Sequence, residues 1–325
     1  MDNERTQRLA QIALVWYGGL GPIGYRRVVG HFGGAQEALR ATPEELSVPS
    51  LRLDPERVNG VSQAHRHLED VAAETKELAQ QNIRVLCDVD EAYPCLLKRM
   101  RDRPPVLCVA GRLDEEAEPS VAIVGTRSPT REGKEQARLL ARACVAERLT
   151  VVSGLALGCD TWAHRGALEV EGRTVAVLGS GIRLLTPKEN AELGRRIAET
   201  GAVVSELPPW VGPSSSRLLA RNRLQVALSQ VVIVVQAGPS GGAMSTAERA
   251  FRTGRPVCVV TWPVDLEKTE GNEKLLQAGG HPLTGPEEIP ELARMVRENL
   301  ERVLREEPGE GSQKTLFADQ DQTEE

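Results

Sequence analysis

Residues 121–127 read Val-Ala-Ile-Val-Gly-Thr-Arg, a short apolar run that ends at a glycine. Further runs of this kind follow at residues 150–152, 174–178, 202–204, 231–235 and 256–260, with amphipathic segments of helical length between them. Strands without polar alternation are typical of a parallel sheet covered by helices on both faces. The sequence therefore predicts an α/β fold with a doubly wound, Rossmann-like parallel sheet that binds ligands at the C-terminal ends of its strands.

The segments that flank this sheet have different compositions. Residues 1–80 lack strand-like runs and predict a small domain of short helices. A strand-like run at residues 83–87 and a proline-rich stretch lead into the sheet domain, which we place at residues 81–290. Residues 291–325 contain the rest of a charged helix and then an acidic tail rich in Gly, Glu and Gln, which we expect to be disordered.

The net charge of −6 hides a strong regional contrast. Residues 121–263 contain 18 Lys and Arg against 11 Asp and Glu, whereas residues 264–325 contain 7 against 16. A basic sheet domain is compatible with a nucleic-acid partner even though the whole chain is acidic. We expect the acidic tail to stay away from nucleic acid and to face protein partners.

Other sequence features exclude several classes of protein. No apolar run is long enough to span a bilayer and the N-terminus lacks a basic leader, so we expect a cytoplasmic protein without a membrane partner. The six cysteines are far apart and show no zinc-binding spacing, which favours reduced, mostly buried thiols and no metal site. No strand is followed by a complete dinucleotide-binding glycine pattern. We therefore expect no cofactor.

Glycine-rich or serine-containing loops follow several of the predicted strands. Such loops let the backbone approach an anion, and amides at a helix N-terminus attract phosphate. Because the strands end at one edge of the sheet, their loops together predict a groove lined for phosphates. The residues that we assign to it from these loops are Gly125, Thr126, Arg127, Ser153, Gly154, Gly179, Gly181, Ser240, Gly241, Gly242 and Thr246.

Arginines add positive charge to this edge. Arg217 and the triplet Arg221-Asn222-Arg223 precede the run at 231–235, and no acidic residue lies between Leu207 and Ala247. Guanidinium groups grip phosphate bidentately and stack on bases. We therefore assign all four residues to the phosphate groove, although a solvated helix face with surface ion pairs is the alternative.

These elements together resemble the DNA-processing protein A family, also called Smf. The resemblance covers roughly residues 83–282. It includes Tyr93-Pro94, Val121–Arg127, Ser153–Ala156 with Gly158, Asp160 and His164, Val175–Gly179, Ser205-Glu206, Arg221–Arg223, Ser240-Gly241 with Thr246-Ala247, Gly254-Arg255 and Gly271-Asn272. So many matches in one order are specific for the family.

The resemblance implies a binding protein without a catalytic step. It implies single-stranded DNA as the ligand, loading of RecA recombinase during natural transformation or recombination, protection of the DNA, and a homodimer. It also implies that residues 19–24, Gly-Leu-Gly-Pro-Ile-Gly, form the hairpin of a helix-hairpin-helix or SAM-like domain, which can offer amides to a DNA phosphate. A purely structural turn is the equal alternative there.

The chain also departs from the family pattern. Where members usually carry a Lys and a Phe-Pro pair before the Arg-Asn-Arg triplet, residues 215–219 read Ser-Ser-Arg-Leu-Leu. Loss of a stacking aromatic removes about 1–3 kcal/mol per base, which predicts weaker DNA binding unless Arg217 or Trp210 takes over. Leu157 replaces an arginine, and we do not expect the winged-helix extension of many members.

The acidic tail contains one short motif. Gln313, Leu316 and Phe317 resemble the Gln-x-x-Leu-Phe peptide by which bacterial replication and repair proteins bind the DNA sliding clamp. Two apolar anchors on an extended segment suit a hydrophobic pocket. The resemblance therefore implies the DNA sliding clamp as a further partner, and a chance match of these five residues is the alternative.

An enzyme or nucleotide sensor is the alternative function. Residues 240–248 also resemble the phosphate-binding element of nucleoside-monophosphate phosphoribohydrolases, which places Glu248 at their catalytic glutamate. A surface ion pair with Arg249 or Arg252 is the competing explanation for Glu248. His164 and Asp160 lie one helical turn apart, and we expect them to have a packing or capping role.

Overall fold

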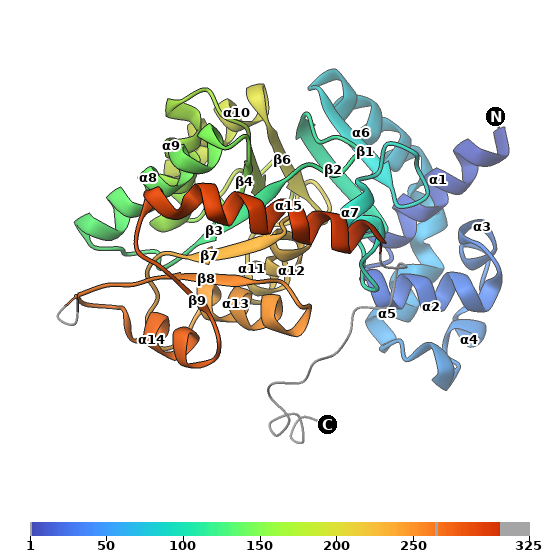
Figure 1. The fold of residues 1–325 in the computed structure, drawn as a ribbon. Coiled ribbons are helices and arrows are strands. Elements are labelled where there is room, and N and C mark those ends of the chain that lie inside the picture. The colour runs from blue at the N-terminus through green and yellow to red at the C-terminus, as the bar shows by residue number, and fades with distance from the viewer. Residues whose placement is uncertain (1, 264–265, 306–325) are drawn as a thin grey trace.

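The computed structural model describes residues 2–263 and 266–305 (Figure 1). Short helices make up the N-terminal part, up to residue 80. They are α1 (Asp2–Trp16), α2 (Pro22–Phe32), α3 (Ala35–Ala38), α4 (Pro43–Leu46), α5 (Pro55–Gln63) and α6 (Leu68–Gln80), with 3₁₀ turns η1 (Pro49–Leu51) and η2 (Ala64–His67). The described residues of this part form short helices and no strand, and we call this part the helical domain.

One mixed sheet occupies the rest of the described chain. Its strands are β1 (Ile83–Cys87), β2 (Val106–Gly111), β3 (Ser120–Val124), β4 (Thr150–Ser153), β5 (Thr174–Val177), β6 (Ala202–Ser205), β7 (Val231–Val234), β8 (Val257–Val260) and β9 (His281–Leu283). They lie in the order β1-β2-β6-β5-β4-β3-β7-β8-β9. All pairs from β6 to β9 are parallel, as predicted.

Alternate residues of each central strand pack on opposite faces of the sheet. Val121, Ile123, Val231 and Ile233 pack against one layer of helices, made of α8 (Arg131–Ala146), α9 (Cys159–Glu169) and α15 (Ile289–Arg305). α10 (Ala191–Thr200) continues this layer over β5 and β6. The other layer consists of α12 (Asn222–Ala227), α13 (Gly242–Arg252) and α14 (Glu270–Gln277). Burial on both faces explains the unbroken apolar runs.

One edge of the sheet is antiparallel, which the sequence did not predict. β2 pairs antiparallel with both β1 and β6. The sequence predicted a strand at residues 83–87, whereas the residues of β2 were treated only as part of a proline-rich stretch. Pro104 and Pro105 precede β2 and leave its ladder intact. The three-residue strand β9 was also missed, because its first two residues are exposed and give no apolar run.

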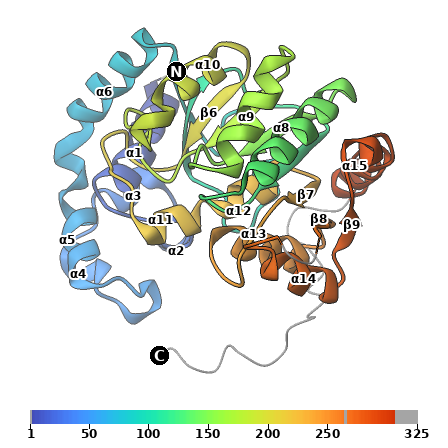
Figure 2. The same cartoon turned by 90° about the vertical axis from the view of Figure 1, so that its left-hand side faces the viewer.

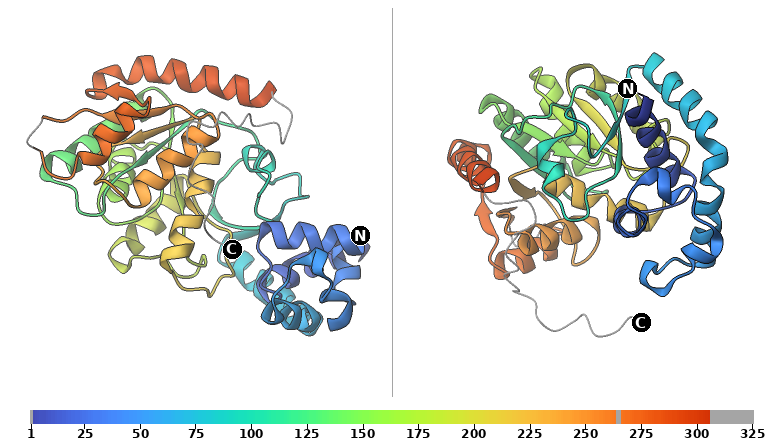
Figure 3. Two further views of the ribbon diagram at one scale, coloured as in Figure 1. Left: turned by 90° about the horizontal axis from the view of Figure 1, so that it is seen from below. Right: turned by 90° about the vertical axis from the view of Figure 1, so that its right-hand side faces the viewer.

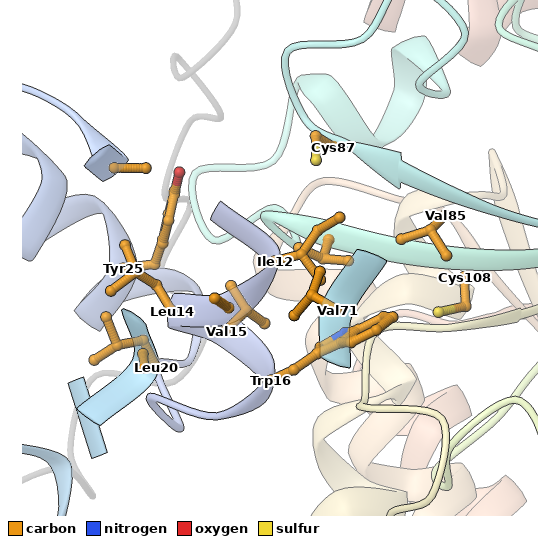
Figure 4. Close-up of a cluster of buried hydrophobic side chains, with 14 of the residues drawn as sticks. Ile12, Leu14, Val15, Trp16, Leu20, Tyr25, Val71, Val85, Cys87 and Cys108 are labelled. Carbon is orange, nitrogen blue, oxygen red and sulfur yellow. The ribbon is translucent and has the colours of Figure 1, made fainter. Parts of the chain in front are cut away.

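The helical domain packs on this edge through a shared core (Figures 3 and 4). Ile12 and Trp16 of α1 belong to the same buried cluster as Val85 and Cys108 of β1 and β2. The Gln11 side-chain amide donates to the Pro105 carbonyl at 2.6 Å. Apolar contact and buried hydrogen bonds therefore cross the predicted boundary at residue 81.

The turn between α1 and α2 contains two of the predicted hairpin glycines, Gly19 and Gly21, whereas Gly24 lies in α2. Gly19 adopts φ +64°, a backbone region that favours glycine. Arg26 pairs with Asp88 at 3.1 Å, and Arg27 donates to the Leu51 carbonyl at 2.8 Å. Both guanidinium groups therefore stabilise the domain internally, and phosphate contact by the hairpin amides stays a prediction.

The remaining helical elements are short. They are α7 (Cys95–Lys98), η3 (Lys188–Asn190), α11 (Ser215–Ala220) and η4 (Pro286–Glu288). All six cysteines are free thiols, as expected, and burial raises the pKa of Cys87 to about 12. Among the described residues, no helix is long and apolar enough to cross a membrane.

Candidate nucleic-acid interface

The strand order places a topological switch at β3. The chain passes from β3 to its neighbour β4 on one side, and β7 pairs with the other side of β3. The loops after β3 and β7 therefore leave the sheet side by side and then diverge. Open α/β sheets bind ligands in the crevice that forms at such a point.

A groove of about 430 Å³ lies at this switch point. Its lining comes from the loop after β3, the loop after β4, the α11–α12 segment and the start of α13. Of the residues predicted from the sequence, it brings together Gly125, Thr126, Arg127, Arg221, Asn222, Ser240, Gly241, Gly242 and Thr246. The groove thus combines most of the predicted first and last loops with part of the arginine triplet.

The N-terminus of α13 opens into the groove. Gly241 precedes the helix at φ +116°, and no described side chain caps this end. The first helical bond runs from Ser245 N to Gly241 O at 3.0 Å, so the amides before it lack helical acceptors. Such amides, together with the helix dipole, favour an anion. Thr246 supports this turn, because its hydroxyl donates to the Gly242 carbonyl at 2.8 Å.

The loop after β3 supplies the other wall. Gly125 packs so closely against Cys159 and the Gln236 carbonyl that a side chain there would collide with them. The Thr126 amide donates to the same carbonyl at 2.7 Å, which holds the loop to β7. Arg127 is exposed, and it forms no ion pair within the described ranges. Its guanidinium is therefore available to a phosphate in the groove.

Arg221 lies buried behind the groove surface. Its guanidinium donates to the Val177 carbonyl at 2.9 Å and lies against Gly154. Burial lowers the pKa of Arg221, and the nearby charge of Arg127 lowers it further, whereas Asp160 raises it. Burial raises the pKa of Asp160, although Arg221 opposes this change. The nearby Asp160 carboxylate therefore partly offsets the positive charge that Arg221 contributes to the groove.

Four of the predicted residues, from the end of β4 and the loops after β4 and β5, do not line the groove. The Ser153 hydroxyl donates to the Ile123 carbonyl at 2.7 Å, and the Gly154 amide donates to Asp160 at 3.1 Å. Gly179 is covered by Leu218, and the Gly181 amide donates to the Val211 carbonyl at 2.7 Å. All four residues are buried. Direct phosphate contact at Ser153, Gly154, Gly179 and Gly181 is therefore not supported by their positions.

Two predicted arginines also lie outside the groove lining. Arg223 is buried and pairs with Glu206 and with Asp102. The Arg217 guanidinium folds back and donates to the Gly212 carbonyl at 3.0 Å. Although no acidic residue lies between Leu207 and Ala247, Arg223 does have acidic partners. Asp102 comes from a distant segment of the chain, and Glu206 lies just before the acid-free stretch. Burial raises the pKa of Glu206, and Arg223 lowers it.

The groove wall is apolar where the family resemblance implies a Phe-Pro pair, and Ser215 stands where it implies a Lys. Leu218 and Leu219 line this wall, and Leu219 is 49% exposed. Trp210 does not line the groove. It packs on Trp16 and Tyr17 of the helical domain, with ring centroids 5.7 and 5.4 Å apart. The suggestion that Trp210 or Arg217 replaces the missing side chains is therefore not supported at this groove.

The contacts of the remaining candidates for catalysis, His164 and Glu248, favour structural roles. His164 is buried, bonds Thr174 through Nδ1 at 2.7 Å and accepts from the Leu155 amide at 3.3 Å. Burial lowers the pKa of His164 to about 3, so it stays neutral at neutral pH. Glu248 is exposed and is not among the groove residues, and Arg249 pairs with Asp102 at 3.0 Å. No cluster of possible metal ligands occurs in the described part of the chain.

Sequence reasoning missed several residues of the groove. Gln225 lines it from α12, and Leu218 and Leu219 were discussed only as replacements. Asp160 was assigned only a packing or capping role, yet it lies in the groove floor beside Arg221. Its place in the loop after β4, at the start of α9, was the available signal.

Comparisons with known proteins identify the family of this chain. A family model described as DNA recombination-mediator protein A matches residues 84–294, more than half of the chain. The chain belongs to this family. Protein Smf of Synechocystis sp. is 34% identical over 284 residues, which cover 83% of this chain and 69% of that protein. A putative DNA processing protein DprA of Mycobacterium tuberculosis is 36% identical over 248 residues, which cover 72% and 64%.

Two solved structures of family members share the fold. DNA processing protein A from Streptococcus pneumoniae matches with a TM-score of 0.71 and 28% identity, over 84% of this chain and 93% of that one. A structure described as giving the single-stranded DNA binding mode of DNA processing protein A from Helicobacter pylori matches with a TM-score of 0.57 and 28% identity. That match covers 68% of this chain and 96% of the other. The predicted α/β fold is confirmed.

Proposed function

We propose that this member of the DNA recombination-mediator protein A family binds single-stranded DNA in the groove at the switch point, without a chemical step. The observation that carries the proposal is the pairing of an uncapped helix N-terminus with an exposed arginine. The free amides of α13 and the Arg127 guanidinium line one groove. Both groups donate hydrogen bonds to an oxyanion, as the phosphates of a DNA backbone require.

The shape of the site favours a single strand. The groove is recessed between loops, and a flexible strand can enter it while a rigid duplex contacts only its rim. The apolar wall at Leu218 and Leu219 can contact bases but offers no stacking ring. Phosphate contacts therefore supply most of the binding free energy. The affinity should fall steeply with salt, with a slope of about −0.7 per neutralised phosphate on a log–log plot.

Arg127→Ala tests the groove directly. We expect the affinity for an oligothymidylate to fall roughly 10- to 100-fold, because a charge-assisted hydrogen bond contributes about 1.5–3 kcal/mol. The salt slope should also flatten by about 0.7. Fluorescence anisotropy at two salt concentrations, with a duplex of the same length for comparison, measures both quantities.

A matched variant controls for the loss of one positive charge. Arg195 is exposed on α10 and pairs with Glu192 at 2.7 Å, outside the groove. Arg195→Ala should leave both the affinity and the salt slope near their original values. Wild-type affinity in Arg127→Ala would show that the groove is misplaced.

The proposal extends to partners that the family resemblance implies. We propose that the DNA-bound protein acts in the cytoplasm, protects the strand and loads RecA recombinase during transformation or recombination, and that a homodimer joins two grooves. A sliding-clamp contact through Gln313, Leu316 and Phe317 is also proposed, and these residues lie outside the described ranges. Clamp affinity that is unchanged after deletion of residues 312–325 would exclude that contact.

A further inference from the structure

A second hollow adjoins the groove on the far side of Arg127. Its volume is about 500 Å³, and it lies over the start of α8 and the first turns of α9, two helices that pack side by side (Figure 2). Arg127 lines both the groove and this hollow. A strand that follows the groove past Arg127 therefore enters the hollow directly.

The hollow is strongly basic. Its charged residues are Arg127, Lys134, Arg165, Lys268 and Glu189. Four cations thus face one carboxylate, and all five side chains are exposed. Lys268 donates to the Ser128 carbonyl at 2.8 Å, which fastens its segment to the loop after β3. Within the described ranges, Lys134 and Arg165 form no ion pair, so both charges are available to phosphates.

An aromatic ring lies in the same hollow. Trp162 of α9 is partly buried, and the Arg165 guanidinium lies over its ring at 5.0 Å from the centroid. The other tryptophans have different surroundings: Trp16 and Trp210 contact each other, and the Trp262 ring nitrogen donates to the Val235 carbonyl at 2.7 Å. Indole and guanidinium planes are both stacking surfaces for nucleobases.

We propose that this hollow is a second subsite for single-stranded DNA, in which a nucleobase stacks on the Trp162–Arg165 pair. Lys134 and Lys268 hold the flanking phosphates, and Arg127 joins the subsite to the groove. This inference rests on the proposed function and deepens it. It also supplies an aromatic platform beside a groove whose wall at Leu218 and Leu219 is apolar and offers no ring.

Trp162→Leu is the decisive variant, because leucine keeps apolar bulk against the core while it removes the ring. We expect the affinity for an oligothymidylate of roughly 15 nucleotides to fall roughly 5- to 100-fold, the loss of one stacked base. Affinity for an abasic strand of the same length should not change, since that strand has no base to stack. Trp162→Phe should restore most of the lost affinity.

Matched controls separate stacking from charge and from folding. Trp210→Ala removes a tryptophan that lies outside both hollows and should leave binding unchanged. The double variant Lys134→Ala/Lys268→Ala should weaken binding of both strands and flatten the salt slope, whereas Lys76→Ala on α6 should do neither. Circular dichroism establishes that each variant is folded.

The outcomes distinguish this subsite from the groove. Equal affinity of Trp162→Leu and wild type for oligothymidylate, with Arg127→Ala still weakened, overturns the subsite and leaves the proposed function standing. Equal losses on the normal and abasic strands also overturn the stacking role. If the wild-type protein binds no single-stranded DNA, the proposed function itself fails. Should Trp162→Leu be unfolded, the double variant Lys134→Ala/Lys268→Ala decides on the subsite: wild-type affinity and an unchanged salt slope in that variant overturn it.

Discussion

The loops after β3 and β5 are similar in sequence, but the first borders the groove and the second is covered by the protein itself. Each follows a buried strand and has a glycine as its first or second residue. The loop after β3 borders the switch point, and its Arg127 is exposed. The loop after β5 is covered by residues 208–218, and its Gly181 has no room for a side chain. A glycine after a strand therefore indicates close backbone packing, and only the surroundings decide whether the neighbour is a ligand or the protein itself.

The same contrast separates the arginines. Arg127 carries an unpaired exposed charge within the described ranges, whereas Arg223 is buried against Glu206 and Asp102. One arginine is placed to bind a ligand, and the other holds β6 and the segment before β2 to α12. A substitution of Arg223 should therefore mainly lower the stability of the fold, whereas a substitution of Arg127 should mainly lower the affinity for DNA.

The largest effect on stability is expected for Arg223→Met. Removal of one partner of a buried ion pair leaves Glu206 with an uncompensated charge, which costs about 3–5 kcal/mol in free energy of unfolding. Urea denaturation measures this loss. Arg127→Met, made as the control, should lower the free energy of unfolding by less than about 0.5 kcal/mol. Equal stability of the two variants would contradict the distinction between them.

An intermediate effect is expected for Gly181→Ala. The added methyl group would meet the carbonyl oxygens of Pro208 and Pro209, so the backbone must shift, at a cost of about 1–3 kcal/mol. Gly212→Ala is the matched control, because nothing lies within 4 Å of its added carbon. Thermal unfolding compares the two. If Gly181→Ala is as stable as the wild type but binds DNA more weakly, the loop after β5 does contribute to DNA binding.

The smallest effect concerns pH. The pKa of His164 is lowered to about 3 in the folded chain, from 6.5 in the unfolded chain, mainly by burial. The unfolded chain therefore binds more protons between these values, and stability falls as the pH falls below about 6.5. His164 alone should remove about 1 kcal/mol between pH 6.5 and about 5.5. The difference between wild type and His164→Gln isolates this contribution, and parallel pH profiles would refute it.

Much of the fold was accessible from the sequence because the central strands have a strong local signal. Unbroken apolar runs predicted the strands from β3 to β8, and their spacing predicted parallel pairing. β2 and β9 lacked such a signal. Of the candidate site, the loops after β3 and β7 were predicted correctly as neighbours at one edge, since both leave C-terminal strand ends. The DNA contacts themselves stay predictions.

The sequence by itself determined the strands from β3 to β8, the helical segments between them, the basic character of the sheet domain and the family. Tertiary structure alone decided which glycines and arginines face a ligand. Asp102 reaches Arg223 from 121 residues away, residues 208–218 cover the loop after β5, and α8 and α9 bring Lys134 beside Trp162. Charge pairing and burial act through space, whereas local patterns record only the neighbours along the chain.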